Sequence, residues 1–193
     1  MRDMSDTAET DEALMARYAN GDVPSFEALY RRHELRVWRY LERNIRNRAT
    51  ADELMQEVWF AVARDAQHYQ PTARFSTWLF TIAHNRMIDS LRANRRQTSL
   101  DELGYEADVV IDQLMAEPSA GPVAAAVARD QATALTRAVE GLPDDQREVF
   151  LLQIEGDLSV EEIATITKSS FETTKSRLRY ARTKLRESLK EYA

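Results

Sequence analysis

The sequence contains no cysteine, only five glycines and no long apolar run. Without cysteine the chain can form neither a disulfide scaffold nor a thiolate metal site, and it suits a reducing cytoplasm. The isolated glycines form neither a phosphate loop nor a dinucleotide-binding fingerprint. No apolar stretch approaches the roughly 18 residues of a membrane-spanning helix, and the acidic N-terminus is unlike a secretory signal. We therefore expect a soluble, cytoplasmic protein with no membrane partner.

Residue patterns for catalysis are missing as well. The histidines His33, His68 and His84 are scattered, and the start of a zinc motif at His33-Glu34 is not completed, because position 37 is valine. No serine nucleophile motif occurs. A nuclease or another nucleic-acid enzyme would need a carboxylate cluster or metal ligands that the sequence does not supply. We expect no cofactor, no metal ion and no catalytic activity.

Helical spacing dominates the sequence, because β-branched residues never alternate with polar ones over a useful length. We expect an all-α fold of two small helical domains joined by an acidic flexible linker. The expected boundaries are 1–11 for a disordered tail, 12–96 for the first domain, 97–122 for the linker and 123–193 for the second domain. Helices are expected over residues 12–19, 24–46, 50–65, 75–96, 124–140 and 142–155, and in two segments between 159 and 189.

Two helix-start signatures lie ten residues apart in the last quarter of the chain. Ser159 and Glu162 have the spacing of a capping box, and Ser169 and Glu172 repeat it. A short helix is therefore followed, after a tight connection, by a second one that can run toward the end of the chain. This is the outline of a helix-turn-helix, whose second helix enters the DNA major groove.

The second helix of this motif has one apolar and one polar face. Between residues 168 and 190 it carries eight basic and two acidic residues. Thr173, Ser176 and Arg179 lie opposite the apolar stripe and could reach base edges and phosphates. A solvated amphipathic helix is the alternative interpretation. The apolar stripe consists of Phe171, Thr174, Leu178, Ala181, Leu185 and Leu189.

The distribution of charge matters more than the net charge of −6. The segment 97–122 contains six acidic residues and no lysine or arginine, so the rest of the chain is close to neutral and its basic C-terminal helix is balanced by acidic patches elsewhere. Such polarity indicates a chain that meets both DNA and a basic protein surface.

Four blocks of the sequence together resemble the extracytoplasmic-function (ECF) subgroup of bacterial sigma factors. They are SFEALYRRHELRVWRYL, TADELMQEVWFAVAR, FSTWLFTIAHNRMIDSLRANRR and the stretch from LPDDQREVF to TKLRESL. The resemblance implies a transcription initiation factor without catalysis of its own. Its implied partners are core RNA polymerase, through the largest-subunit coiled coil and the flap, and promoter DNA in duplex and single-stranded form.

By this resemblance, the loop 67–74 takes an extruded base of the downstream (−10) promoter element, and the helix after it follows the strand or the duplex edge. Aromatic faces and positive charge suit unpaired bases. For Phe75 and Trp78 we favour plain core packing, because both fit the buried stripe. The residues assigned to the −10 element are Tyr69, Arg74, His84, Asn85, Arg86 and Arg92.

The acidic face of the helix 50–65 is assigned to the polymerase coiled coil by the same resemblance. Thr50 stands where relatives commonly have an acidic residue, and with Glu53 it has capping-box spacing, so we interpret it as the helix N-cap. An alternative hypothesis is that phosphorylation of Thr50 supplies the missing charge and switches polymerase binding on. The residues assigned to polymerase are Asp52, Glu53, Gln56 and Glu57.

The helix-turn-helix would bind the upstream (−35) promoter element. It departs from relatives at the turn, where Thr167-Lys168 replaces a usual Leu-Gly pair, so either Lys168 adopts the left-handed conformation or the turn differs. We expect Thr173, Ser176 and Arg179 to read bases, and Lys175 and Arg177 to bind phosphates. The full −35 set is Lys168, Ser170, Phe171, Thr173, Lys175, Ser176, Arg177 and Arg179.

Three questions stay open from the sequence. A stand-alone helix-turn-helix regulator, which would bind operator DNA without polymerase, is the alternative function. Control by an anti-sigma protein and control by a kinase are both compatible with a chain that carries no evident regulatory domain. The acidic linker is either a plain tether or, by the resemblance, a segment that threads the polymerase cleft.

Overall fold

The computed structural model describes residues 9–98 and 122–190, with side chains for 9–94 and 130–190. All regular structure in these ranges is helical, as the sequence predicts. Residues 99–121, and with them most of the predicted linker, lie outside the described residues, as does most of the predicted tail. The elements are α1 (Asp11–Ala19), α2 (Val23–Ile45), α3 (Arg48–Arg64), the 3-10 turn η1 (Ala66–His68), α4 (Phe75–Thr98), α5 (Pro122–Glu140), α6 (Asp144–Gly156), α7 (Val160–Ile166) and α8 (Phe171–Ser188).

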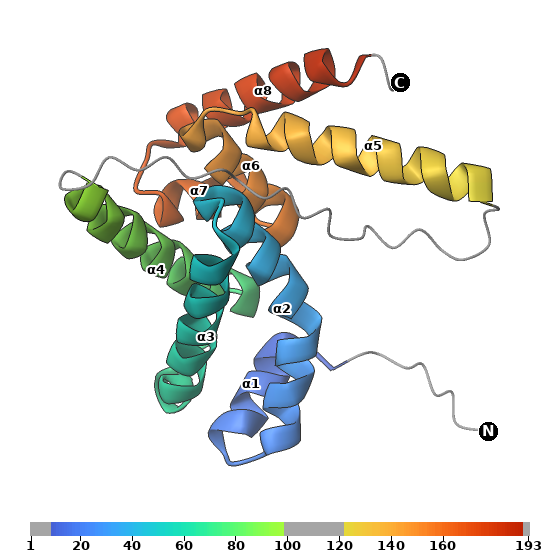
Figure 1. The fold of residues 1–193 in the computed structure, drawn as a ribbon. Helices are drawn as coiled ribbons and strands as arrows, with labels where there is room; N and C mark the ends of the chain where they lie inside the picture. The colour runs from blue at the N-terminus through green and yellow to red at the C-terminus, as the bar shows by residue number, and fades with distance from the viewer. Residues whose placement is uncertain (1–8, 99–121, 191–193) are drawn as a thin grey trace.

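The first half of the chain is built around α2, which packs against α1, α3 and α4 (Figure 1). Pro24 lies in the first turn of α2, where its missing N–H is not needed. The helix ends at Ile45, and its C-cap residue Arg46 has a left-handed backbone conformation with a φ of 57°. Apolar residues at helical spacing, among them Leu29, Val37 and Leu41, are fully buried against the neighbouring helices. This half therefore has a core of its own that holds α3 and α4 in fixed positions.

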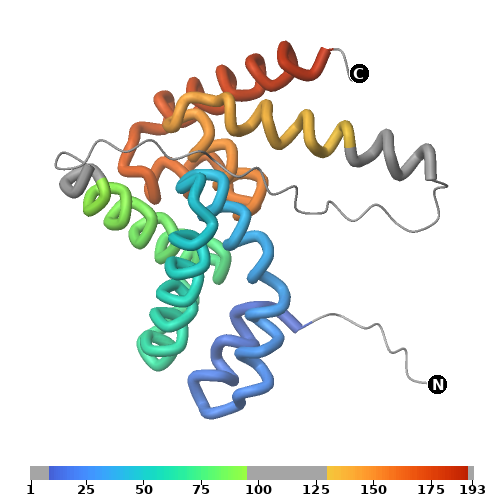
Figure 2. The backbone as a smooth tube through the Cα atoms, viewed as in Figure 1, coloured from blue at the N-terminus to red at the C-terminus, as the bar shows by residue number. Residues whose placement is uncertain are grey.

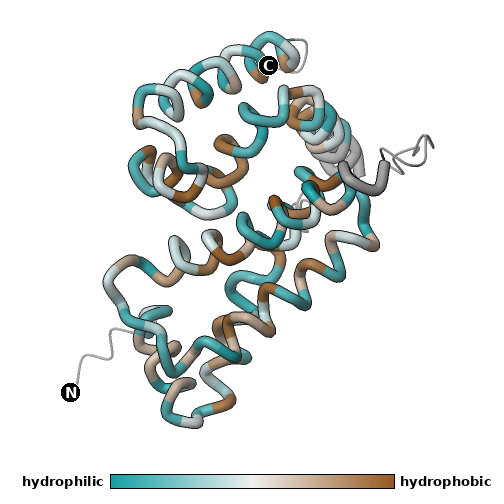
Figure 3. The backbone as a smooth tube through the Cα atoms, turned by 90° about the vertical axis from the view of Figure 1, so that its left-hand side faces the viewer, coloured by the Kyte–Doolittle hydropathy of each residue, from teal (hydrophilic) through white to brown (hydrophobic). Residues whose placement is uncertain are grey.

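The second half combines α5 and α6 with the helix-turn-helix of α7 and α8. Both α6 and α7 pack on α8, and Leu151, Leu152 and Ile163 are buried among them. Figure 3 shows hydrophobic and hydrophilic residues alternating along these helices, as expected of helices with one buried face. The core holds α7 and α8 at a fixed crossing and leaves the outer face of α8 exposed.

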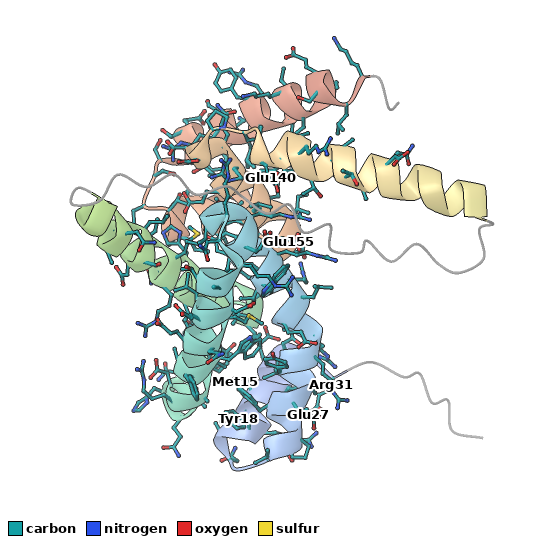
Figure 4. The ribbon with its side chains drawn as sticks, viewed as in Figure 1. Met15, Tyr18, Glu27, Arg31, Glu140 and Glu155 are labelled. Carbon is teal, nitrogen blue, oxygen red and sulfur yellow. The ribbon has the colours of Figure 1, made fainter. Side chains whose placement is uncertain are left out.

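The two halves lie directly against each other. Figure 2 shows the C-terminal half covering one end of the N-terminal helices, and α6 packs along α2 while α7 packs on α4. Gly156 allows the close approach, because an added Cβ would lie 2.8 Å from Leu158 and 3.4 Å from Phe80 of α4. Glu155, labelled in Figure 4, lies 3.4 Å from Arg43 of α2. The apolar cores of the two halves thus form one continuous cluster.

Candidate nucleic-acid and protein-binding surfaces

The helix-turn-helix begins with the predicted capping box at α7. The Ser159 side chain accepts the Glu162 backbone N–H at 3.2 Å, and the Glu162 carboxylate accepts the Ser159 N–H at 2.8 Å. The two groups satisfy each other's free backbone donors, which fixes where α7 starts. The prediction for this helix is confirmed.

The turn between α7 and α8 is held by hydroxyl groups. Lys168 is left-handed, with a φ of 53°, so the first of the two predicted alternatives is correct. The predicted capping box at Ser169 is wrong, because Ser170 is the N-cap and accepts the Thr173 N–H at 3.1 Å. Ser169 instead bonds to the hydroxyl of the buried Thr174 at 2.7 Å. A buried hydroxyl needs a partner, so Thr174 decides which serine caps the helix.

The two faces of α8 separate as predicted except at Phe171, which was predicted on the apolar stripe but is 40% exposed. Thr174, Leu178, Ala181 and Leu185 are buried. On the other side, Lys168, Ser170, Phe171, Thr173, Lys175 and Arg179 are exposed, and Ser176 and Arg177 are half-buried.

Some of these −35 candidates have partners within the chain. The Arg177 guanidinium pairs with Asp145 of α6 at 2.5 Å, so it is held near the start of that helix. The Lys175 ammonium lies 5.8 Å from the centre of the Phe171 ring. Arg179 lies over the Tyr180 ring at 5.0 Å. These contacts hold the cationic groups on one outer face without burying them.

In the first half, the loop ahead of α4 splits into an exposed part and a packed part. Gln70 and Thr72 are exposed. Tyr69 is partly buried, with its ring 4.9 Å from that of Trp78 and 6.2 Å from that of Phe75. Burial, together with the nearby carboxylates of Glu12 and Asp11, raises the pKa of Tyr69 to about 12, and its buried hydroxyl has no partner. Tyr69 is therefore packed against its aromatic neighbours and is not a free side chain.

His84 is not at the surface, where the sequence led us to expect it. It is 7% exposed, its Nδ1 lies 2.9 Å from a carboxylate oxygen of Glu148 on α6, and it is 3.4 Å from the hydroxyl of Tyr40. The reason is tertiary, because α6 covers this part of α4. In this arrangement His84 cannot touch DNA.

Arg74 is also engaged by the second half. Its guanidinium lies 3.1 Å from Glu162 and 3.4 Å from Asp157, and Thr77 donates a hydrogen bond to Glu162 at 2.5 Å. Burial acts to raise the pKa of Glu162, but the hydrogen bonds from Thr77 and Ser159 and from Arg74 outweigh it and lower that pKa to about 2. Glu162 therefore has two roles: it completes the capping box of α7 and it links the second half to the first.

The remaining −10 candidates border a cleft between the halves. This cleft has a volume of about 660 Å³ and includes Thr167 and Lys168 from the turn of the second half. Asn85 and Arg92 are exposed, and Arg86 lies 3.9 Å from Glu57 of α3. The structure thus brings Asn85, Arg86 and Arg92 together along α4 and separates them from the exposed loop residues.

The acidic face of α3 lies beside an apolar groove that the sequence did not indicate. Asp52, Glu53, Gln56 and Glu57 are all exposed. Asp52 accepts the indole N–H of Trp38 at 2.7 Å. Phe60, on the same stripe as Gln56, is 73% exposed; the spacing of four residues could have revealed it. The adjoining groove has a volume of about 370 Å³ and is lined by Phe26, Tyr30, Met55, Gln56, Trp59, Phe60 and Ala63.

Thr50 is not the N-cap of α3, and this prediction is wrong. The helix begins two residues earlier, and Asn47 caps it by accepting the Thr50 N–H at 3.0 Å. The Thr50 side chain is half-exposed in the first turn. Asparagine is preferred over threonine as a helix N-cap, which favours the earlier start.

The described ranges contain neither a cluster of metal ligands nor a membrane-spanning helix. No group of three or more potential ligands is placed to hold a metal ion there. No helix among the described residues is sufficiently long and apolar to cross a bilayer.

Each half of the chain matches a known protein family. Residues 29–97 match the family Sigma-70 region 2, and residues 132–185 match Sigma-70, region 4. The chain is 34% identical over 182 residues to RNA polymerase sigma factor CarQ of Myxococcus xanthus, covering 92% of this chain and 96% of that protein. It is 29% identical to the ECF RNA polymerase sigma factor SigK of Mycobacterium bovis (strain BCG / Pasteur 1173P2), covering 92% of each.

A solved structure shares the fold. It is the sigma factor RpoE in complex with the anti-sigma factor NepR from Bartonella quintana, with a TM-score of 0.69 and 22% identity over 87% of this chain and 98% of that chain. The sequence identity to CarQ extends over nearly the full length of both proteins, and the two matched regions coincide with the α2–α4 bundle and the helix-turn-helix. The chain therefore belongs to the ECF RNA polymerase sigma factors, which direct core polymerase to promoters for transcription initiation.

Proposed function

We propose that residues 12–96 bind core polymerase and the −10 element, and that residues 123–193 bind the −35 element. The observation that carries this division is the exposed basic face of α8. The cap at Ser170 fixes where α8 starts, and the buried stripe on its opposite side leaves the basic face outward. The polymerase supplies the catalysis, so this chain needs no cofactor. The place of action is the cytoplasm, where polymerase and promoter DNA meet.

In the second half, Thr173, Ser176 and Arg179 would read bases, and Lys175 and Arg177 would contact phosphates. A bidentate arginine contact to a base contributes about 1–3 kcal/mol of discrimination. We expect Arg179→Ala to lower affinity for specific −35 DNA and to leave scrambled DNA nearly unaffected. Lys175→Ala should weaken binding to both and reduce its salt dependence. Equal losses for both variants on both DNAs would refute this division of roles.

In the first half, Asp52, Glu53, Gln56 and Glu57 would pair with a basic surface of polymerase while the groove at Phe60 takes an apolar side chain. An exposed aromatic ring beside carboxylates is typical of an interface core with a polar rim. Phe60→Ala should weaken polymerase binding more than Glu53→Gln does. DNA binding by the second half should not change.

The −10 role requires the halves to separate, because Arg74 and His84 are engaged by α7 and α6. The absence of cysteine makes this testable. In a Thr77→Cys, Glu162→Cys variant, a short bismaleimide bridge would hold the halves together. The bridged protein should still bind −35 DNA and fail to open promoters in holoenzyme, whereas each single variant treated alike should open them. Normal opening by the bridged protein would contradict this requirement.

We keep Thr50 as a proposed phosphorylation site. A kinase and an anti-sigma protein are both proposed regulators of this chain. The half-exposed hydroxyl lies in the first turn of α3, where a phosphate is favoured by the helix dipole. Thr50→Glu should bind polymerase more tightly than Thr50→Ala. Equal binding by the two variants would exclude the switch.

A further inference from the structure

We propose that Glu12 of α1 is a positioning residue for promoter opening, because its carboxylate caps α4 and thereby fixes the loop that precedes it. The proposal rests on the function proposed above for residues 12–96, and specifically on capture of an extruded −10 base by the loop 67–74. It extends the machinery to α1, which lies before residues 29–97, the part that matches Sigma-70 region 2.

The contact is a hydrogen bond from the first residue of α4. The Glu12 Oε1 atom accepts the Phe75 backbone N–H at 2.8 Å. The first four N–H groups of a helix have no partner inside it, and a carboxylate at that end is also favoured by the helix dipole. Helix caps usually come from the residue just before the helix. Here the cap comes from 63 residues away.

α1 is fixed firmly enough to act as a brace. Asp11, next to Glu12, accepts hydrogen bonds from Arg32 at 2.8 Å and from His33 at 2.7 Å, both on α2. Met15 of α1, labelled in Figure 4, is fully buried in the core. Two neighbouring carboxylates therefore tie α1 to α2 and to the start of α4. With α1 held on α2 by these contacts, the Glu12 carboxylate is placed to cap the start of α4.

The position of Phe75 in turn sets the packing of the rings of Tyr69, Phe75 and Trp78, which we call the aromatic floor of the loop. The Phe75 ring packs 5.3 Å from that of His33 and 5.9 Å from that of Trp78, and Tyr69 packs on both Phe75 and Trp78. Gln70 and Thr72 remain exposed above this floor. A base captured there would meet a surface whose geometry depends on the Phe75 backbone. Loss of the Glu12 contact would free the start of α4 and disorder that surface.

The test uses holoenzyme reconstituted from the full chain and core polymerase. The probe is the single-stranded −10 element of a promoter that this holoenzyme transcribes, intact and with an abasic nucleotide at each position in turn. The variants are Glu12→Ala and Glu12→Gln. The matched control is Glu9→Ala, because the Glu9 side chain pairs with Arg17 of α1, and within the described part of the chain no hydrogen bond or ion pair joins that side chain to the loop. Gln70→Ala and Thr72→Ala test the loop itself.

We expect Glu12→Ala to weaken binding of the intact strand about fivefold, the factor typical of a lost helix cap. Glu12→Gln, which keeps an acceptor oxygen, should lose roughly twofold. The loss should disappear on the strand whose captured base is missing, because the floor then has nothing to hold. Polymerase affinity and −35 binding should match those of Glu9→Ala.

Three results would overturn the proposal. Equal losses on every abasic strand would mean that Glu12 acts only through general stability. An unchanged affinity for Glu12→Ala, while Gln70→Ala and Thr72→Ala weaken binding, would show that the loop captures a base without this brace. If the loop variants also bind normally, the proposed role of the loop fails, and the positioning role fails with it.

Discussion

The loop before α4 and the turn before α8 each lead into a helix proposed to touch DNA, yet they are held in opposite ways. The turn is held by its own neighbours, since Ser169 bonds to Thr174 and Ser170 caps through Thr173. The loop is held by residues that are distant in the sequence. Glu12 caps Phe75 from 63 positions away, and Glu162 contacts Arg74 from 88 positions away. The turn is a local device, and the loop depends on the whole fold.

This difference predicts which surface can be disturbed separately from the other. Local hydrogen bonds form whenever their short segment folds, whereas distant ones require the elements between them to be in place. Changes in α1 should therefore reach the loop and spare the turn, and changes within residues 167–174 should do the reverse.

The largest effect is expected for Met15→Ala, which truncates a fully buried core side chain of α1. Core truncations of this kind cost about 2–5 kcal/mol of unfolding free energy. Chemical denaturation measures the loss, and hydrogen exchange under native conditions locates it. Exchange should accelerate at residues 66–75. The comparison fails if residues 167–170 accelerate to the same extent.

An intermediate effect is expected for Glu162→Gln, with a definite pH dependence. The pKa of Glu162 is about 2 in the folded chain, below the ordinary value of 4.5. Its charge therefore stabilises the fold fully above pH 4.5, and this contribution is lost as the pH falls from 4.5 toward 2.

At neutral pH, Glu162→Gln should cost roughly 1 kcal/mol of unfolding free energy. The gap between variant and wild type should close as the pH falls, which urea unfolding at several pH values would measure. Glu161→Gln, on the exposed side of the same turn, serves as the control. A gap that is constant with pH would show that the charge of Glu162 does not join the halves.

The smallest effect, of opposite sign, is expected for Lys168→Gly. The left-handed φ of 53° costs a residue with a side chain roughly 1 kcal/mol, and glycine adopts it freely. We expect the unfolding free energy to rise by about 0.5–1 kcal/mol, while −35 DNA binding weakens because a cation is lost. Thermal unfolding and a binding titration would measure the two separately. A less stable variant would contradict the strain argument.

The pattern of correct and incorrect predictions follows the same division. The box at Ser159 and Glu162 was predicted correctly, and the left-handed Lys168 was one of two predicted alternatives, because each depends on residues within a few positions. The cap at Thr50 was wrong by three residues, since asparagine is preferred over threonine and Asn47 caps the helix. The cap at Ser169 was wrong by one residue, since the neighbouring Ser170 is the same residue type. His84 was misplaced because only the packing of α6 on α4 buries it. Glu12 gave no signal, because nothing in its neighbourhood indicates Phe75.

By itself the sequence determined the helices, the helix-turn-helix and the family, because periodicity, caps and charge act over short distances. The tertiary structure decided which groups are free to bind. It placed His84 and Arg74 against the second half, set Phe60 beside the acidic face of α3, and brought the Glu12 carboxylate to the start of α4. The physical reason is that burial and long-range hydrogen bonds arise only when helices distant in sequence meet.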